Sequence, residues 1–173
     1  MAEKIRVMYS EEEVSARIKE IAEQINHDYE GKEVHLIGIL RGGSFFMCDL
    51  AKRISLPVTI DFMSASSYGM STTSSGVVKI VKDLEESIVG RHVIVVEDII
   101  DTGRTLSYLL GMLREPASLK LCTLLNKPDR RVVDVKIDYN GYTIPDEFVV
   151  GYGLDYAQRY RNLPYIGVVE FEE

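Results

Sequence analysis

The sequence contains no tryptophan, only two cysteines and only three histidines among its 173 residues. Cys48 and Cys122 lie far apart, each in an apolar segment, so we expect two reduced core residues rather than a disulfide or a metal site. The histidines lie at a helix end or at strand starts without companion ligands. Zinc binding and histidine-based acid/base chemistry therefore have no visible basis in this sequence.

Basic residues are also scarce relative to acidic ones: 20 Lys and Arg oppose 27 Asp and Glu, which gives a net charge of −7 and a pI of about 5.1. Because phosphate backbones and anionic lipids repel such a charge, we expect no general nucleic-acid binding and no membrane-surface role, although a local basic pocket stays compatible with it. No apolar run approaches the length of a bilayer crossing, and no signal-peptide pattern precedes the first polar helix. We therefore expect a cytoplasmic protein.

Hydrophobic residues make up 46% of the chain, and no shift of composition marks a domain boundary. This is enough apolar material for one core, so we expect a single domain over residues 1–173. The order of elements is a helix followed by strands that alternate with helices, with glycine turns at several strand ends. That order predicts an α/β fold with a mainly parallel central sheet flanked by helices, in which ligands bind at the carboxyl ends of the strands.

The stretch from residue 93 to residue 106 carries the strongest functional signal. The β-branched run at 93–96 predicts a buried parallel strand, and residues 106–113 predict the helix that follows it. The turn between them offers backbone N–H groups, two hydroxyls and one cation from Thr102, Gly103, Arg104 and Thr105. Such groups at a helix N-terminus are how a chain cradles a phosphate.

Three carboxylates accompany this loop. Glu97 and Asp98 can accept hydrogen bonds from sugar hydroxyls or hold a Mg²⁺ ion through water, and Asp101 can take a proton. The alternative is an ordinary strand-to-helix turn whose acids are merely solvated. The run Val-Glu-Asp-Ile-Ile-Asp-Thr-Gly-Arg-Thr at 96–105 favours a site, because it resembles the ribose-phosphate motif of the type I phosphoribosyltransferase family. Its Glu-Asp-Ile-Ile-Asp variant resembles the hypoxanthine-guanine branch of that family.

A second glycine loop follows the apolar strand at 34–40 and precedes a helix at 44–54. Gly42 and Gly43 allow close backbone approach to an anion, and Arg41 adds charge; an ordinary tight strand-to-helix turn is the alternative. The resemblance implies a pyrophosphate-binding loop here, in which the family often has a cis peptide bond although no proline follows.

A polar segment at 64–76 follows the strand at 57–63, and residues 77–81 return to a strand pattern. Its small hydroxyl residues cannot bury enough apolar area to order themselves, so we expect a mobile loop. Composition leaves a plain linker and a lid over a ligand equally open. The resemblance implies a lid, since Ser67 and Tyr68 are similar to the pair at the start of the family's catalytic lid.

Charge gathers again at 126–131, after the apolar strand at 119–125, where a solvated turn is the common outcome. The resemblance implies instead that Lys127 hydrogen-bonds the exocyclic oxygen of a 6-oxopurine. It further implies that Phe148 stacks on the base and that the backbone of Val149 reads the purine edge. Asp155 would be an acid near the Mg²⁺ ion, and Arg161 would contact the pyrophosphate. Considered alone, Phe148 would be a core residue.

The resemblance as a whole implies Mg²⁺-dependent transfer of a phosphoribosyl group from phosphoribosyl pyrophosphate (PRPP) to hypoxanthine, with guanine as a second base, by a homodimer or homotetramer. Asp101 would be the catalytic residue, and Glu97, Asp98 and Asp155 the metal-binding acids. We expect a core at about 30–125 and a small hood from about 1–29 and 126–173. The alternatives are a xanthine- or adenine-preferring transferase and a PRPP- or nucleotide-binding regulator of the same fold.

Overall fold

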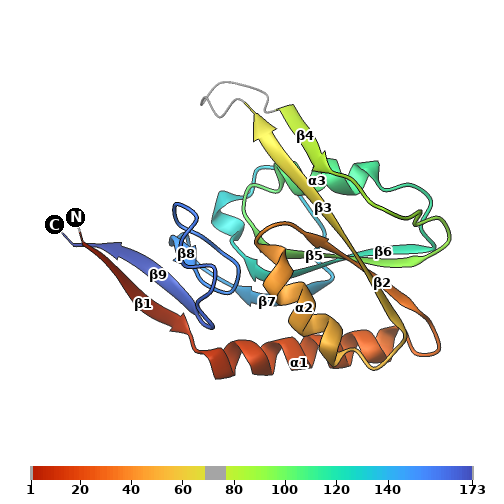
Figure 1. The fold of residues 1–173 in the computed structure, drawn as a ribbon, viewed down its shortest axis with the longest axis horizontal. Coiled ribbons are helices and arrows are strands. Elements are labelled where there is room, and N and C mark those ends of the chain that lie inside the picture. The colour runs from red at the N-terminus through yellow and green to blue at the C-terminus, as the bar shows by residue number, and fades with distance from the viewer. Residues whose placement is uncertain (1, 69–76, 173) are drawn as a thin grey trace.

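A computed structural model describes residues 2–68 and 77–172 of the chain (Figure 1). A six-stranded sheet, in the order β4-β3-β2-β5-β6-β7, forms the centre; β3, β2, β5, β6 and β7 are parallel and β4 is antiparallel. The elements are β1 (Glu3–Tyr9), α1 (Glu11–Asp28), β2 (Val34–Ile39), α2 (Gly43–Arg53), β3 (Val58–Tyr68), β4 (Val77–Lys82), β5 (His92–Ile100), α3 (Arg104–Met112), β6 (Ser118–Asn126), a 3-10 turn (Pro128–Arg130), β7 (Tyr139–Thr143), β8 (Val149–Val150) and β9 (Ile166–Phe171). The expected α/β fold with a mainly parallel sheet is confirmed.

Helices cover both faces of this sheet, and each face has its own core. On one face α1 and α2 contribute Ile18, Phe46 and Leu50, all fully buried. On the other face α3 contributes Leu109 against β2 and β5. Because helices cover both faces of the sheet, β2 is buried at all six positions. A strand in such a place is a nearly continuous apolar run.

Helix α1 begins at a capping box of Ser10 and Glu13, since Ser10 Oγ accepts from the Glu13 backbone at 3.2 Å and the Glu13 carboxylate accepts in return. Its apolar positions recur at helical spacing and are all buried, namely Val14, Ile18, Ile21, Ala22 and Ile25. Within the described part of the chain, no helix combines the length and the apolar composition that a bilayer crossing requires.

A second, three-stranded antiparallel sheet in the order β1-β9-β8 joins the two ends of the chain, and it stands beside the main sheet (Figure 1). We call it the hood sheet. Two segments that we expected in the hood lie elsewhere: α1 packs along α2, and β7 pairs with β6 at the edge of the main sheet. The reason is the apolar stripe of α1, which needs the large apolar face that only the main sheet and α2 provide.

The strand β3 is longer than the sequence predicted. It continues to Tyr68 because Ser64 to Tyr68 pair with β4, whereas we expected a loop from residue 64. Small hydroxyl residues have weak strand propensity, and here cross-strand pairing with a later segment outweighs it. The remainder of the expected lid, 69–76, lies outside the described residues, and the lid stays a prediction.

The two cysteines are both free but differ in environment. Cys122 is fully buried in β6, and burial raises the pKa of its thiol, as expected for a core residue. Cys48 is exposed, contrary to our expectation. It lies between Met47 and Leu50, which are buried, but its own position on α2 turns away from the sheet.

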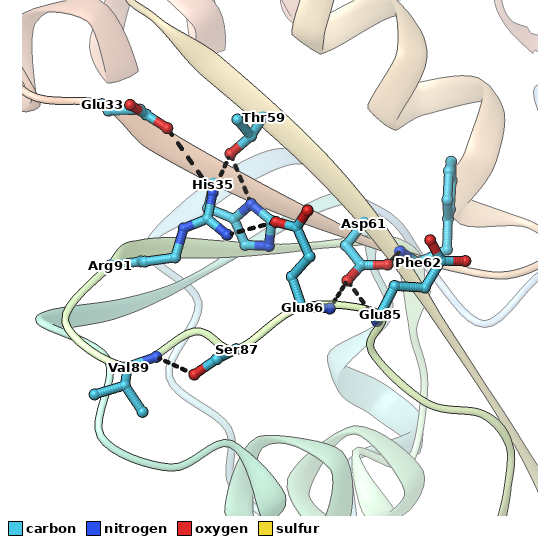
Figure 2. A network of polar contacts seen from close by, with 10 residues as sticks. All are labelled: Glu33, His35, Thr59, Asp61, Phe62, Glu85, Glu86, Ser87, Val89 and Arg91. Carbon is cyan, nitrogen blue, oxygen red and sulfur yellow. Dashed lines mark hydrogen bonds and ion pairs between the residues drawn. The ribbon is translucent and has the colours of Figure 1, made fainter.

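A polar network ties together the amino ends of the strands, at the edge opposite the loops that follow them (Figure 2). His35 of β2 is 2% exposed and its Nδ1 lies 2.8 Å from Thr59 Oγ1 of β3, which also accepts from Arg91 Nη2 at 2.8 Å. Asp61 of β3 accepts from the backbone of Glu85 at 2.9 Å. Burial, with the nearby charge of Arg91, lowers the pKa of His35 below its ordinary value.

This histidine gives the fold a testable pH dependence. Well above pH 6.5 His35 is neutral in both states, and as the pH falls through about 6.5 the unfolded chain binds a proton more readily than the folded protein does. The free energy of unfolding therefore falls as pH drops below that value. We expect a shallower fall for His35→Asn, which keeps an acceptor for Thr59 and cannot titrate. Denaturant unfolding of both proteins at pH 7.5 and 5.5 checks this, and parallel falls would contradict it.

Candidate active site

The loops after β2, β5 and β6 meet at the carboxyl edge of the main sheet, where parallel α/β folds bind ligands. A loop that follows the hood strand β8 closes on the same edge. Contact between them is tight, since a Cβ on Gly153 would lie 2.1 Å from the Gly42 carbonyl oxygen. Gly153 also has a φ of +97°, which disfavours any larger residue. The hood loop and the loop after β2 therefore form one wall of a shared site.

Two carboxylates stand at the end of β5. Glu97 and Asp98 are half-buried; Glu97 Oε1 accepts from the Asp98 backbone at 3.0 Å, and Asp98 Oδ1 accepts from the Ile99 backbone at 2.7 Å. Burial raises the pKa of both groups, and for Glu97 the charge of Asp98 adds to the rise. The charge of Arg161 opposes the rise for Asp98. Two crowded acids favour a cation or hydroxyl donors between them.

The expected phosphate cradle follows β5. Gly103 has a φ of +82°, and a Cβ there would lie 2.6 Å from the Val133 carbonyl oxygen. The Thr102 carbonyl accepts from the backbone N–H groups of Val132 and Val133 at 2.9 and 3.0 Å, which fixes the loop. The N-cap residue of α3 is Gly103, which has no side chain to cap the helix, and the Arg104 N–H makes one long hydrogen bond, 3.4 Å, to Thr102 Oγ1. Apart from this one long hydrogen bond, the first N–H groups of the helix are suited to an anion.

Asp101 lies between this cradle and the loop after β6. Its side chain is 46% exposed, yet its Oδ1 is buried and accepts no hydrogen bond from any described residue. Arg130 Nε forms an ion pair with Oδ1 at 3.3 Å, while Arg131 Nε donates to the Asp101 carbonyl at 3.0 Å. One carboxylate oxygen is thus held from the protein side, and the exposed part of the side chain faces solvent.

Lys127 is brought beside Asp101, because its backbone N–H donates to the Ile100 carbonyl at 3.0 Å. The residue is only 6% exposed, and its Nζ donates to the Glu147 carbonyl at 2.8 Å. Asp146 Oδ1 lies 3.8 Å from the same Nζ. A buried ammonium with only part of its donor capacity used is equipped to bind a ligand oxygen.

The hood places its aromatic residue at the surface. Phe148 is 51% exposed and contacts Tyr156 edge-on, with 5.6 Å between ring centroids. It is therefore not a core residue, and its free face is available for stacking. Val149, the next residue, is buried in β8 and pairs with Val168 of β9.

The residues expected at the pyrophosphate come from two distant loops. The Leu40–Arg41 peptide bond is cis, as the resemblance implied for this loop, and Arg41 is exposed. Arg161 Nη1 donates to the Gly153 carbonyl at 2.7 Å, and its Nη2 lies 3.2 Å from Asp155 Oδ1. Both arginines thus stand on the wall formed by Gly42 and Gly153.

The three acids expected at the metal do not form one cage. Within residues 2–68 and 77–172, no three His, Cys, Asp or Glu side chains gather as ligands for an ion. Asp155 is occupied on both oxygens, by Arg161 and by the backbone of Gln158 at 2.9 Å. Glu97 and Asp98 fit a Mg²⁺ ion that takes most of its ligands from water and substrate oxygens, as this ion does at phosphates.

Three residues in contact with the site were not predicted from the sequence, namely Arg130, Asp146 and Gln158. Arg130 lies in the charged run at 126–131, and charged runs of this kind usually form solvated turns. Its ion pair with Asp101 is what connects it to the site. Asp146 adjoins both Arg130 and Lys127, at 3.7 and 3.8 Å. Gln158 has no charge, so no sequence signal marked it.

Gly42 offers a test of Asp98 that leaves Asp98 itself unchanged. A Cβ on Gly42 would lie 1.7 Å from Asp98 Oδ2, so Gly42→Ala must displace that carboxylate. The φ of Gly42 is −60°, which alanine adopts freely, and the protein should fold. We expect the KM for PRPP to rise about tenfold or more.

Gly111→Ala is the matched control, because nothing lies within 4 Å of a Cβ at that position of α3. It should leave the KM unchanged and add up to about 1 kcal/mol of stability. Steady-state kinetics and thermal unfolding of the two variants make the comparison. An unchanged KM for PRPP in Gly42→Ala would exclude Asp98 from the PRPP-binding role that the family resemblance implies.

Comparison with known families identifies the class of protein. The phosphoribosyl transferase domain family matches residues 8–157, a range that includes the β5 acids, the cradle and the hood loop as far as Ala157. The chain belongs to this family.

Individual relatives show which members of the family this chain is similar to. The chain is 54% identical to hypoxanthine phosphoribosyltransferase from Salmonella typhimurium, over 98% of this chain and 97% of that one. It is 52% identical to the bifunctional protein TilS/HprT of Listeria monocytogenes, of whose length it spans 26%. A crystal structure of a hypoxanthine-guanine phosphoribosyltransferase from Bacillus anthracis superposes with a TM-score of 0.90 at 48% identity, covering 98% of this chain and 100% of that chain.

Proposed function

We propose that this chain transfers the phosphoribosyl group of PRPP to hypoxanthine, giving inosine monophosphate and pyrophosphate, and that guanine is a second acceptor. One observation supports it most directly: Asp101, buried Lys127 and exposed Phe148 stand at the edge that also bears the phosphate cradle. A proton acceptor, an ammonium and a flat ring suit a 6-oxopurine base, and the cradle suits a ribose phosphate. The close relatives named above support the same reaction.

Catalysis in this proposal consists of positioning and charge stabilisation. Bond breaking at the anomeric carbon develops an oxocarbenium-like sugar and a departing pyrophosphate, so the base and the sugar must be held in line. Arg41 and Arg161 stabilise the departing charge. Asp101, held through Oδ1 by Arg130, accepts or shares the proton of purine N7.

Selection of the base falls to Lys127. Its ammonium can only donate hydrogen bonds, so it suits the exocyclic oxygen of hypoxanthine or guanine. With adenine, a 6-amino group would meet the ammonium and leave two donors facing each other. This is the physical ground for ranking a 6-oxopurine above adenine, and xanthine is separated from hypoxanthine only by contacts elsewhere on its ring.

Mg²⁺ is the proposed cofactor. Glu97 and Asp98 would hold it through water and the ribose hydroxyls, and Asp155 would lie on the pyrophosphate side. Burial raises the pKa of both Glu97 and Asp98, and the charge of Asp98 raises that of Glu97 further, which supports a cation beside them. The ion would supply charge neutralisation for the pyrophosphate group.

A regulator that binds PRPP while controlling RNA is the other class of function. The site's proton acceptor and ammonium favour the enzyme, as does the net charge of −7. A spectroscopic assay of inosine monophosphate formation, with and without EDTA, should be run beside filter binding to RNA. Mg²⁺-dependent turnover without RNA retention supports the enzyme; RNA retention without turnover would overturn it.

We further propose one cytoplasmic domain that assembles as a homodimer or homotetramer. Exposed apolar side chains on β3 and β4 support subunit contact, with Ile60 at 51%, Val77 at 69% and Val81 at 64% exposure. The exposed free thiol of Cys48 suits a reducing compartment. Light scattering after gel filtration gives the mass, and a monomer at working concentration would contradict the assembly.

A further inference from the structure

One neutral side chain joins the two arginines of the proposed pyrophosphate site. Gln158 Oε1 accepts from Arg41 Nη1 at 3.0 Å and from Arg161 Nη2 at 3.1 Å. Arg41 belongs to the loop after β2 and Arg161 to the loop after β8, so this contact bridges the two loops. A guanidinium group can only donate, and therefore the amide of Gln158 must present its oxygen to both.

The backbone holds Gln158 in a conformation that its residue type does not favour. Ala157 and Gln158 have φ angles of +51° and +65°, in the left-handed region, and they form the two-residue turn between Tyr156 and Arg159. Such turns ordinarily contain Asn and Gly. The Gln158 N–H donates to Asp155 Oδ2 at 2.9 Å, which fixes the turn. The turn thus directs the amide toward the arginines, although the left-handed backbone conformation costs some conformational free energy at a residue other than glycine.

The same contacts explain why a neutral side chain, and not a carboxylate, suits position 158. Both guanidinium nitrogens lie about 3 Å from one oxygen, so two like charges are drawn close together. A carboxylate there would attract them more strongly but would cancel part of the field that binds an anion. An amide oxygen uses one N–H of each guanidinium. Among the described residues the Arg41 guanidinium makes no other hydrogen bond, so its remaining donors are free for phosphate oxygens, whereas Arg161 also donates to the Gly153 carbonyl and pairs with Asp155.

We propose that Gln158 is a positioning residue for pyrophosphate: it sets the spacing and orientation of Arg41 and Arg161 without reducing their positive charge. The proposal rests on the proposed function, because it assumes that these arginines bind the pyrophosphate part of PRPP. It predicts an effect on pyrophosphate and PRPP that does not extend to the purine base.

The test compares Gln158→Met, which keeps the length and removes the acceptor, with Gln24→Met, the same substitution at an exposed position of α1. Calorimetric titration with Mg²⁺ and pyrophosphate gives the Kd, and steady-state kinetics gives both KM values. For Gln158→Met we expect the Kd for pyrophosphate and the KM for PRPP to rise about tenfold, with the KM for hypoxanthine within about twofold. Gln24→Met should match the original protein throughout.

Arg41→Ala shows whether Gln158 acts through the arginines. Arg41 is exposed, so its removal should leave the fold intact, and in this background Gln158→Met should raise the Kd clearly less than in the original protein. Gln158→Glu restores the acceptor but adds charge; its loss of affinity should shrink as salt rises, whereas that of Gln158→Met should persist.

The outcomes separate two failures. If Arg41→Ala and Arg161→Ala leave pyrophosphate binding unchanged, the proposed function of these arginines is wrong and the inference falls with it. If both arginines matter while Gln158→Met binds pyrophosphate normally, only the inference is overturned. It is also overturned if Gln158→Met weakens binding equally in the Arg41→Ala background, or if it raises the KM for hypoxanthine as much as that for PRPP.

Discussion

Asp101→Asn should lower turnover by about 10²- to 10⁴-fold, the usual contribution of a general acid or base. Asparagine keeps the size of the side chain and an oxygen that can face Arg130, which lies 3.3 Å from Asp101 Oδ1. It cannot accept the purine proton. Because the lost interaction concerns the reacting base and not the bound PRPP, the affinity for PRPP should hardly change.

The neighbouring acids supply the matched contrast. Glu97→Gln and Asp98→Asn should weaken PRPP binding more than they lower turnover, since their partners are sugar hydroxyls and metal waters that are present before the reaction. Steady-state kinetics and direct PRPP titration on the three variants, over a range of pH, give the comparison. Near-normal turnover with collapsed PRPP binding in Asp101→Asn would move Asp101 to the sugar-binding acids.

Lys127→Met should erase most of the discrimination between hypoxanthine and adenine. Methionine keeps much of the length of this buried side chain, so the loss is that of the ammonium. A charge-assisted hydrogen bond of about 1.5–3 kcal/mol corresponds to roughly 10- to 150-fold in the ratio of kcat/KM for the two bases. PRPP binding should change little, because the proposed contact is to the base alone.

Lys120→Met is the control on the same strand, since Lys120 lies near the amino end of β6 beside Tyr139 and Asp28. It should leave the base preference unaltered. Kinetics with hypoxanthine and adenine, each at saturating PRPP, decides the matter. A Lys127→Met protein that keeps the original preference would remove Lys127 from the purine site.

The sequence predicted those parts of the fold and site that depend on neighbouring residues. The buried strand before Glu97 and the glycine loop at Gly103 are local patterns, and each is found where the pattern placed it. β5 extends to Ile100, beyond the predicted end, because its last residues pair with β6. Local composition carries no information about such a partner strand.

Contacts between distant loops were beyond local reasoning. The bond of Gln158 to Arg41 joins positions 117 apart, and that of Arg130 to Asp101 depends on where β5 and β6 end. The burial of His35 depends likewise on Thr59 and Arg91, which belong to other segments. In each case the chemical role of a residue follows from the approach of two segments, which only the folded chain shows.

The most direct test of the proposed function is a competition among hypoxanthine, guanine, adenine and xanthine at equal concentrations, with PRPP and Mg²⁺, following by chromatography which base disappears. We expect hypoxanthine to be consumed, guanine to follow, and adenine to remain, with one pyrophosphate released per base consumed. Preferential consumption of adenine or xanthine would contradict the assignment of the base, and binding of PRPP with no base consumed would contradict the enzyme itself.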